Sequence, residues 1–149
     1  MKIETKYFGE MELLEDEIVH FPQGIFGFED NKSFVIIRFE NDNDSLLCLQ
    51  SVTDELLAFV LMNPFYVKKD YKPELSTQDS DDLKINSDTP VSLYAITVVH
   101  DKFEKSTINL KCPIVVNCNE NLAKQVVLDT NEYSLRHPIA SGRTENGQC

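Results

Sequence analysis

The chain has 149 residues and a formal net charge of -11, with 42% hydrophobic and 26% charged residues. This length is typical of one domain, which can bury roughly 68–70% of its unfolded surface, and the hydrophobic content excludes a disordered protein. The net charge opposes direct binding to nucleic acid or anionic lipid, since both carry dense negative charge. The densest basic spot is only Lys68-Lys69 with Lys72 nearby. A basic protein is therefore the expected partner.

Short segments with strand composition recur along the chain, separated by turn-forming residues. The predicted strands are residues 3–8, 11–14, 18–21, 33–39, 46–52, 58–62, 91–99, 107–118 and 125–129. In residues 107–118, every second side chain from Ile108 onward is apolar, which predicts one buried face that includes Cys112 and Cys118. Pro113 cannot donate to a neighbouring strand, so it marks an edge or a bend.

The stretch between residues 63 and 85 does not alternate and carries helix-start signals instead. Asn63-Pro64 is typical of a helix start, with Asn as the cap and Pro in the first turn. Pro73-Glu74 is a second possible start, and Ser76 three residues before Asp79 is a weak capping pattern. One or two short helices are therefore predicted here.

We find no internal repeat and no linker, so the chain is predicted to form a single domain over residues 1–139. About eight or nine short strands at this spacing predict an all-β sandwich or a small barrel. Residues 140–149 are small and polar without strand or helix patterning, and we expect them to form a flexible C-terminal tail.

The absence of several sequence features indicates the cellular compartment. The first residues mix charges without an apolar stretch, so no secretory signal is expected. The longest apolar run, residues 56–62, is about 10 residues too short for a membrane span. The four cysteines form no C-x-x-C pair, which argues against a disulfide framework or a common zinc site. We expect a reduced, cytoplasmic protein that does not enter membranes.

The residue patterns of common enzymes are missing. The five glycines form neither a phosphate-binding loop nor a dinucleotide-binding fingerprint. The acidic residues 79–82 resemble a calcium loop, but Lys84 and Pro90 stand where such a loop needs Gly and Glu. The three histidines lack the spacing of a helical metal site. We therefore predict no enzymatic activity, no cofactor and no metal.

Two patterns remain that suit contact with another protein. Acidic residues gather in residues 10–17, 40–44 and 79–82, either as solvated faces or as a surface that attracts a basic protein. Residues 21–29 interleave three phenylalanines with Gly24 and Gly27, which is typical of a tight turn. We interpret this turn as a structural corner of the fold, with a binding loop as the alternative.

The pattern Phe-Pro-x-Gly-Ile-x-Gly-Phe-Glu over residues 21–29 resembles the signature of the FliW family of flagellar assembly factors. The resemblance extends over residues 1–139, and its further motifs are Leu49-Gln50-Ser51-Val52, Asp54, Leu57-Ala58-Phe59, Asn63-Pro64 and Tyr133-Ser134-x-Arg136-His137-Pro138. It implies an all-β fold, a small antiparallel β-barrel-like single domain with one or two short helical segments.

The same resemblance implies a function. Proteins of this family bind flagellin in the cytoplasm and also bind CsrA, a small dimeric RNA-binding regulator that represses flagellin translation. In this family flagellin and CsrA exchange on the assembly factor, so the resemblance implies that the level of flagellin controls the translation of flagellin. The alternative is a small β-barrel enzyme or small-molecule binder with an interior pocket.

Candidate partner-binding residues follow from the resemblance together with charge. CsrA must be basic to bind RNA, so we expect Glu15, Asp16 and Glu17 to contribute to its capture. For flagellin we expect an apolar surface near residues 49–54 and 63–71. The candidate contacts there are Gln50, Asp54, Phe65, Tyr66 and Tyr71.

Overall fold

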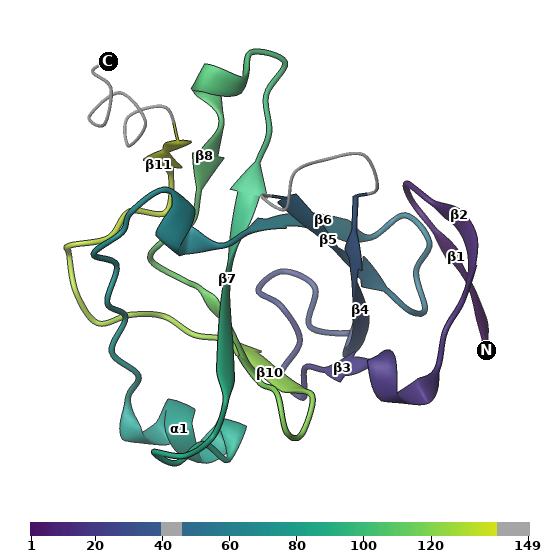
Figure 1. Cartoon of the computed structure of the whole chain (residues 1–149), viewed down its shortest axis with the longest axis horizontal. Coiled ribbons are helices and arrows are strands. Elements are labelled where there is room, and N and C mark those ends of the chain that lie inside the picture. Colours follow the sequence, from purple (N-terminus) through teal and green to yellow (C-terminus); the bar gives the residue numbers. More distant parts are fainter. Residues whose placement is uncertain (40–45, 140–149) are drawn as a thin grey trace.

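The structure is a computed structural model in which residues 1–39 and 46–139 are described (Figure 1). The predicted acidic turn at residues 40–44 and the predicted tail at residues 140–149 lie outside the described residues. The strands are β1 (Lys2–Thr5), β2 (Gly9–Glu12), β3 (Val19–His20), β4 (Ser33–Arg38), β5 (Leu46–Ser51), β6 (Ala58–Met62), β7 (Val91–Val98), β8 (Thr107–Ile108), β9 (Ile114–Asn117), β10 (Leu122–Gln125) and β11 (His137–Pro138). The helical segments are η1 (Glu15–Glu17), η2 (Pro64–Tyr66), α1 (Thr77–Leu83) and η3 (Phe103–Lys105).

Strand pairing closes the main sheet into a ring. Antiparallel pairs run from β3 through β4, β5 and β6 to β7, and β9 pairs with both β10 and β7. A single parallel pair, Leu122 with His20, joins β10 to β3 and completes a ring of seven strands within the described residues. The predicted all-β, mainly antiparallel fold is confirmed. Its barrel-like form depends on β7, whose first half pairs with β9 and whose second half pairs with β6.

A cluster of apolar side chains fills the inside of this ring. Along β4, Phe34 and Ile36 belong to the interior cluster, whereas Val35 and Ile37 belong to a different cluster outside, as the alternation of a strand requires. The buried interior members come from β3 to β6, β9, β10 and the turn after β3, and they include Phe21, Ile25, Phe34, Leu49, Leu61 and Ile114. The ring is therefore a packed core.

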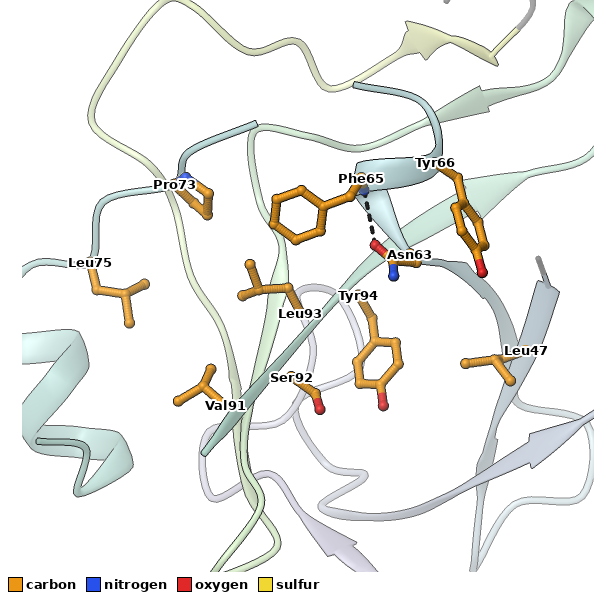
Figure 2. Close-up of a pocket in the computed structure, with 10 residues that line it drawn as sticks. All are labelled: Leu47, Asn63, Phe65, Tyr66, Pro73, Leu75, Val91, Ser92, Leu93 and Tyr94. Carbon is orange, nitrogen blue, oxygen red and sulfur yellow. Dashed lines mark hydrogen bonds between the residues drawn. The ribbon is translucent and has the colours of Figure 1, made fainter. Parts of the chain in front are cut away.

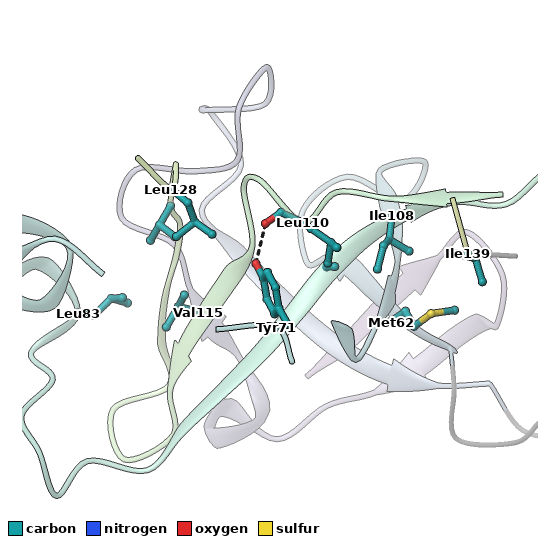
Figure 3. Packing of buried hydrophobic residues seen from close by; sticks show 10 residues of the cluster. Met62, Tyr71, Leu83, Ile108, Leu110, Val115, Leu128 and Ile139 are labelled. Carbon is teal, nitrogen blue, oxygen red and sulfur yellow. Dashed lines mark hydrogen bonds between the residues drawn. The ribbon is translucent and has the colours of Figure 1, made fainter. Parts of the chain in front are cut away.

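Two further clusters cover the outside of the barrel. The N-terminal ribbon of β1 and β2, drawn in purple in Figure 1, places Ile3 and the following Leu13 against Val35, Ile37 and Cys48. On another side, the segment between β6 and β7 packs with the chain after β10 in a second outer cluster (Figure 3). Its buried members include Met62, Tyr71, Leu83, Leu110, Val115 and Leu128.

Helix α1 begins and ends at identifiable caps. The Ser76 side chain accepts a hydrogen bond from the Asp79 N–H at 3.0 Å, which confirms the capping pattern seen in the sequence. At the other end, Lys84 adopts a left-handed conformation with φ 57°, and the Asn117 amide donates to the Leu83 carbonyl at 2.8 Å. The alternative start at Pro73-Glu74 is wrong, because the cap lies at Ser76.

Lys124 of β10 fastens α1 to the barrel. Its Nζ donates to Asp79 Oδ1 and to Asp82 Oδ2, both at 2.7 Å. The hydrogen bond from Lys124, followed by one from Gln78, lowers the pKa of Asp82. Burial acts to lower the pKa of Lys124, but its bonds to the two carboxylates outweigh burial and raise that pKa. The helix is therefore held by charge as well as by apolar packing.

We expect Asp82→Asn to lower the stability of the protein at neutral pH and to have no effect in strong acid. The pKa of Asp82 is lower in the folded state, so its stabilisation is present above its ordinary value of 3.8 and is lost as pH falls through the folded-state pKa. Urea unfolding at several pH values should show wild type and variant converging in acid. Asp81→Asn, an exposed position of the same helix, is the control and should follow wild type. A difference between Asp82→Asn and wild type that stays constant with pH would contradict this account.

Residues 107–118 do not form one strand. β8 and β9 occupy the two ends, and between them the Cys112 N–H bonds to the Asn109 side chain at 2.9 Å, so the chain turns instead of continuing straight. The predicted bend near Pro113 is confirmed. Cys112 is buried as expected, but Cys118 is exposed because it lies past the end of β9. The expectation that Cys118 lies in the core is wrong.

The predicted strand at residues 125–129 is also displaced. β10 begins at Leu122 and ends at Gln125, since the turn after β9 contains Asn121 at φ 50° and antiparallel pairing starts directly after it. The other predicted strands are present, most of them shorter at one or both ends.

Candidate functional site

An open groove of about 630 Å³ lies beside η2, and its lining includes Leu47 and Tyr94, which also pack against the interior cluster (Figure 2). The first residues of β7 line it on one side, and η2 with the segment before α1 line it on the other. Most of its lining is apolar and includes Leu47, Phe65, Tyr66, Leu75, Val91 and Tyr94. An open apolar groove of this size is typical of a protein-binding surface.

The local structure of η2 explains why two aromatic rings reach this groove. Asn63 Oδ1 accepts a hydrogen bond from the Phe65 N–H at 2.9 Å, so Asn63 caps the turn as its sequence predicts (Figure 2). Pro64 is buried, so this residue packs the turn against the rest of the protein. The next two side chains then project outward, with Phe65 39% and Tyr66 57% exposed.

Tyr71 does not share this exposure, and its expected role as a surface contact is wrong. The side chain is 4% exposed, and its hydroxyl donates to the Leu110 carbonyl at 2.7 Å (Figure 3). Its ring packs edge-on against those of Phe65 and Tyr133, with centroids 5.9 and 4.7 Å away. Burial raises the pKa of Tyr71 well above its ordinary value. Tyr71 therefore packs, as a buried residue, against Phe65, which lines the groove.

Gln50 is likewise placed inside the protein, so direct contact with a partner is excluded in this conformation. Its side chain is fully buried. Its Oε1 accepts from the Lys6 N–H at 2.9 Å, and its Nε2 lies 3.1–3.3 Å from the carbonyls of residues 51, 54, 55 and 57. An amide has only two N–H groups, so these carbonyls share them. Gln50 organises the loop between β5 and β6.

Asp54 stands on that loop and is exposed. Its Oδ1 accepts from the Leu56 N–H at 3.1 Å, and its own N–H donates to Ser51 Oγ at 3.0 Å. The carboxylate therefore has a defined position on the surface. It does not line the groove beside η2.

The acidic turn η1 is a separate surface. Glu15, Asp16 and Glu17 are all exposed, and none of them lines the groove. The turn is fixed at two points, because Glu17 Oε1 accepts from the Leu14 N–H at 2.8 Å and the Asp16 carbonyl accepts from the Asn121 amide at 2.6 Å. A fixed turn with three exposed carboxylates can attract a cationic surface.

Other residues of this region were not identified by sequence reasoning. Val91 and Tyr94 line the groove, although the alternation of β7 predicted only a strand and not which residues would face a hollow. A second hollow of about 610 Å³ lies past Leu75, and its lining contains Asp70, Glu74 and Glu132. Acidic character at these positions is visible in the sequence, but their proximity is not.

Within residues 1–39 and 46–139, no three His, Cys, Asp or Glu side chains gather in a group able to hold a metal ion. The helices of this part of the chain are all too short or too polar to cross a membrane. Burial raises the pKa of Cys48 to about 11 and also raises the pKa of Cys112, so neither thiol is set up as a nucleophile.

Comparison with known proteins defines the class to which this barrel belongs. A family model described as FliW protein matches residues 2–139. The chain is also similar to a crystal structure of the flagellar assembly factor FliW, with a TM-score of 0.87 and 38% identity, over 93% of this chain and 96% of that one. The chain therefore belongs to the FliW family of flagellar assembly factors.

Individual relatives agree with this assignment. The chain is 42% identical over 139 residues to the flagellar assembly factor FliW of Ruminiclostridium cellulolyticum, which covers 93% of this chain and 94% of the relative. It is 42% identical over 139 residues to the flagellar assembly factor FliW of Bacillus subtilis, covering 93% and 96% of the two chains. The resemblance inferred from the motifs is confirmed.

Proposed function

We propose that this protein is a cytoplasmic partner-exchange factor that binds flagellin and CsrA and so couples the level of flagellin to its translation. Membership of the FliW family supports a role in flagellar assembly. The apolar groove and the separate acidic turn η1 are two surfaces on which protein partners could bind. The observation that carries the proposal is the pair of adjacent exposed rings, Phe65 and Tyr66, at the groove. Exposed aromatic side chains beside a groove are the usual anchors of protein–protein contacts.

The groove is the surface that we assign to flagellin. Burial of Phe65 and Tyr66 against a partner would remove apolar area from water and would fill the hollow over Leu75 and Val91. Tyr71 is not offered as a contact, but it keeps the Phe65 ring in position.

The acidic turn η1 is the surface that we assign to CsrA. An RNA-binding protein carries a basic surface, and the exposed carboxylates of Glu15, Asp16 and Glu17 would attract it over long range. The net charge of -11 also repels the RNA that CsrA would otherwise hold. No bond is made or broken in this exchange, so no catalytic step is proposed.

Binding of the purified protein to flagellin and to CsrA tests the proposal. Phe65→Ser/Tyr66→Ser should weaken flagellin binding by about tenfold or more, because buried aromatic anchors carry much of an interface's affinity. Glu15→Ala/Asp16→Ala/Glu17→Ala should weaken CsrA binding and flatten its dependence on salt, because charge attraction is screened. Val98→Ser, an exposed apolar position outside both surfaces, is the control.

The outcomes separate the parts of the proposal. If the wild-type protein binds neither flagellin nor CsrA, the proposed function is wrong. If the triple variant keeps both its CsrA affinity and its salt dependence, the acidic turn is not the CsrA surface. The alternative of an interior small-molecule pocket gains no support, because buried side chains such as Phe21, Phe34 and Leu49 occupy the inside of the barrel.

A further inference from the structure

A second exposed apolar surface lies apart from the groove, at the end of the barrel where β4 begins and β5 ends. It consists of Phe26 and Phe28, on the turn before β4, and Leu56, on the loop between β5 and β6, and we call it the turn surface. These side chains are 52%, 42% and 74% exposed. None of them lines the groove or belongs to the acidic turn.

The turn that carries Phe26 and Phe28 is held in one conformation. The Phe28 N–H donates to the Ile25 carbonyl at 2.7 Å, and Gly27 takes the φ of 88° that such a tight turn requires. The Phe26 N–H donates to Gln125 Oε1 at 3.0 Å, which attaches the turn to β10. The Phe28 ring packs edge-on against Phe59, with centroids 5.3 Å apart. Phe26 therefore projects from a fixed base.

The loop that carries Leu56 is fixed as well, and it is tied to the segment that follows the turn. Ser51 Oγ donates to Asn31 Oδ1 at 2.9 Å, and the Val52 N–H donates to the Ser33 carbonyl at 2.9 Å. The Leu56 N–H is held by Asp54 Oδ1 at 3.1 Å. A preorganised surface loses little conformational entropy when a partner binds, so more of the contact energy appears as affinity.

The charged side chains around the turn surface are mostly negative. Four exposed carboxylates accompany the apolar side chains, and they belong to Glu29, Asp30, Asp54 and Glu55. The nearby Lys32 directs its Nζ to the carbonyls of Pro22 and Glu29, at 3.0 and 2.9 Å. An apolar centre with an acidic border complements a protein face on which apolar side chains are flanked by Lys or Arg.

We propose that the turn surface is the docking site of a basic protein partner, whose apolar side chains pack on Phe26, Phe28 and Leu56 while its Lys and Arg side chains meet the four carboxylates. This inference rests on the proposed function, in which CsrA is the basic partner. The new element is the set of turn-surface contacts that would keep CsrA bound. Exposed charges such as those of η1 mainly raise the association rate, whereas buried apolar anchors slow dissociation.

Association and dissociation of the full chain with immobilised CsrA test this division of roles. Phe26→Ser/Leu56→Ser should raise the dissociation rate by about tenfold or more and leave the association rate nearly unchanged. Phe65→Ser/Tyr66→Ser, which removes an equal number of exposed apolar side chains at the groove, should dissociate from CsrA as wild type does. Because the substituted side chains are exposed, the thermal unfolding of both variants should stay close to that of wild type.

A charge reversal provides a second variant that leaves the apolar side chains in place. Glu55→Lys should lower the association rate with CsrA and weaken its dependence on salt. If wild type binds CsrA while Phe26→Ser/Leu56→Ser and Glu55→Lys both behave as wild type, this inference is overturned and the proposed function stands. If the same variants lose flagellin and not CsrA, the surface serves the other partner and the inference is also overturned. If wild type does not bind CsrA, the proposed function fails together with this inference.

Discussion

Replacing Gly24 with alanine should destabilise the protein by about 2–4 kcal/mol. Gly24 has φ 70°, a conformation that costs an L-residue free energy, and its backbone N–H donates to the Phe21 carbonyl at 2.8 Å. An added Cβ would lie 2.6 Å from the Glu29 Cα and 2.8 Å from the Glu29 carbonyl oxygen. These are backbone atoms, so relief of the clash would open the turn over the buried Ile25. Equilibrium unfolding in urea measures the loss.

Gly27 is the matched control for this prediction. It lies in the next turn, residues 25–28, and has φ 88°, but no atom beyond its chain neighbours lies within 4 Å of an added Cβ. Gly27→Ala should therefore cost only the free energy of holding an alanine at positive φ, about 1–2 kcal/mol. Equal losses in the two variants would show that the close approach of Gly24 to Glu29 adds nothing to stability.

Replacing Gln50 with leucine should cost about 2–4 kcal/mol of unfolding free energy. Leucine has a similar volume but cannot accept from the Lys6 N–H or donate to the loop carbonyls that surround Gln50 Nε2. Those groups lie at a fully buried position, where an unpaired polar atom is costly. Urea unfolding measures the loss, and hydrogen exchange should show faster exchange of the Leu57 N–H, which bonds within the same loop.

Gln23→Leu is the control for the buried amide. Gln23 is exposed, and its Nε2 donates to Asp82 Oδ2 at 3.2 Å, so its loss should cost less than about 1 kcal/mol. A Gln50 variant as stable as the Gln23 variant would mean that water or a rearranged loop satisfies the polar groups.

Local patterns in the sequence predicted much of the fold. Alternation located most of the strands, and Asn63 and Ser76 marked the starts of η2 and α1 through the hydrogen bonds that their side chains accept. These signals succeed because a cap or an alternating strand depends on residues only a few positions apart. The pattern of β9 was less informative, since Val115 packs in an outer cluster while Ile114 packs in the barrel interior. A strand covered on both faces has no polar side to reveal.

The candidate site was predicted less completely. Phe65, Tyr66 and Tyr71 are chemically alike and close in sequence, yet only the first two face water. The difference comes from the Leu110 carbonyl, which is 39 residues from Tyr71 and offers its hydroxyl a partner inside the protein. Gln50 is a polar residue in a family motif, and its burial follows from the loop that folds back over it. Neither placement can be inferred from nearby residues.

The sequence by itself determined the family, the position of most strands, the two helix caps and the net charge of -11 that opposes direct contact with RNA. Only the tertiary structure decided that β7 pairs with both β6 and β9 and so closes the barrel. It also decided which rings remain at the surface, and it joined the segment after the Phe26 turn to the start of the loop with Leu56 through the bond between Asn31 and Ser51. Propensities and caps act over a few residues, whereas these features depend on contacts between segments far apart in the chain, which only the packed fold brings together.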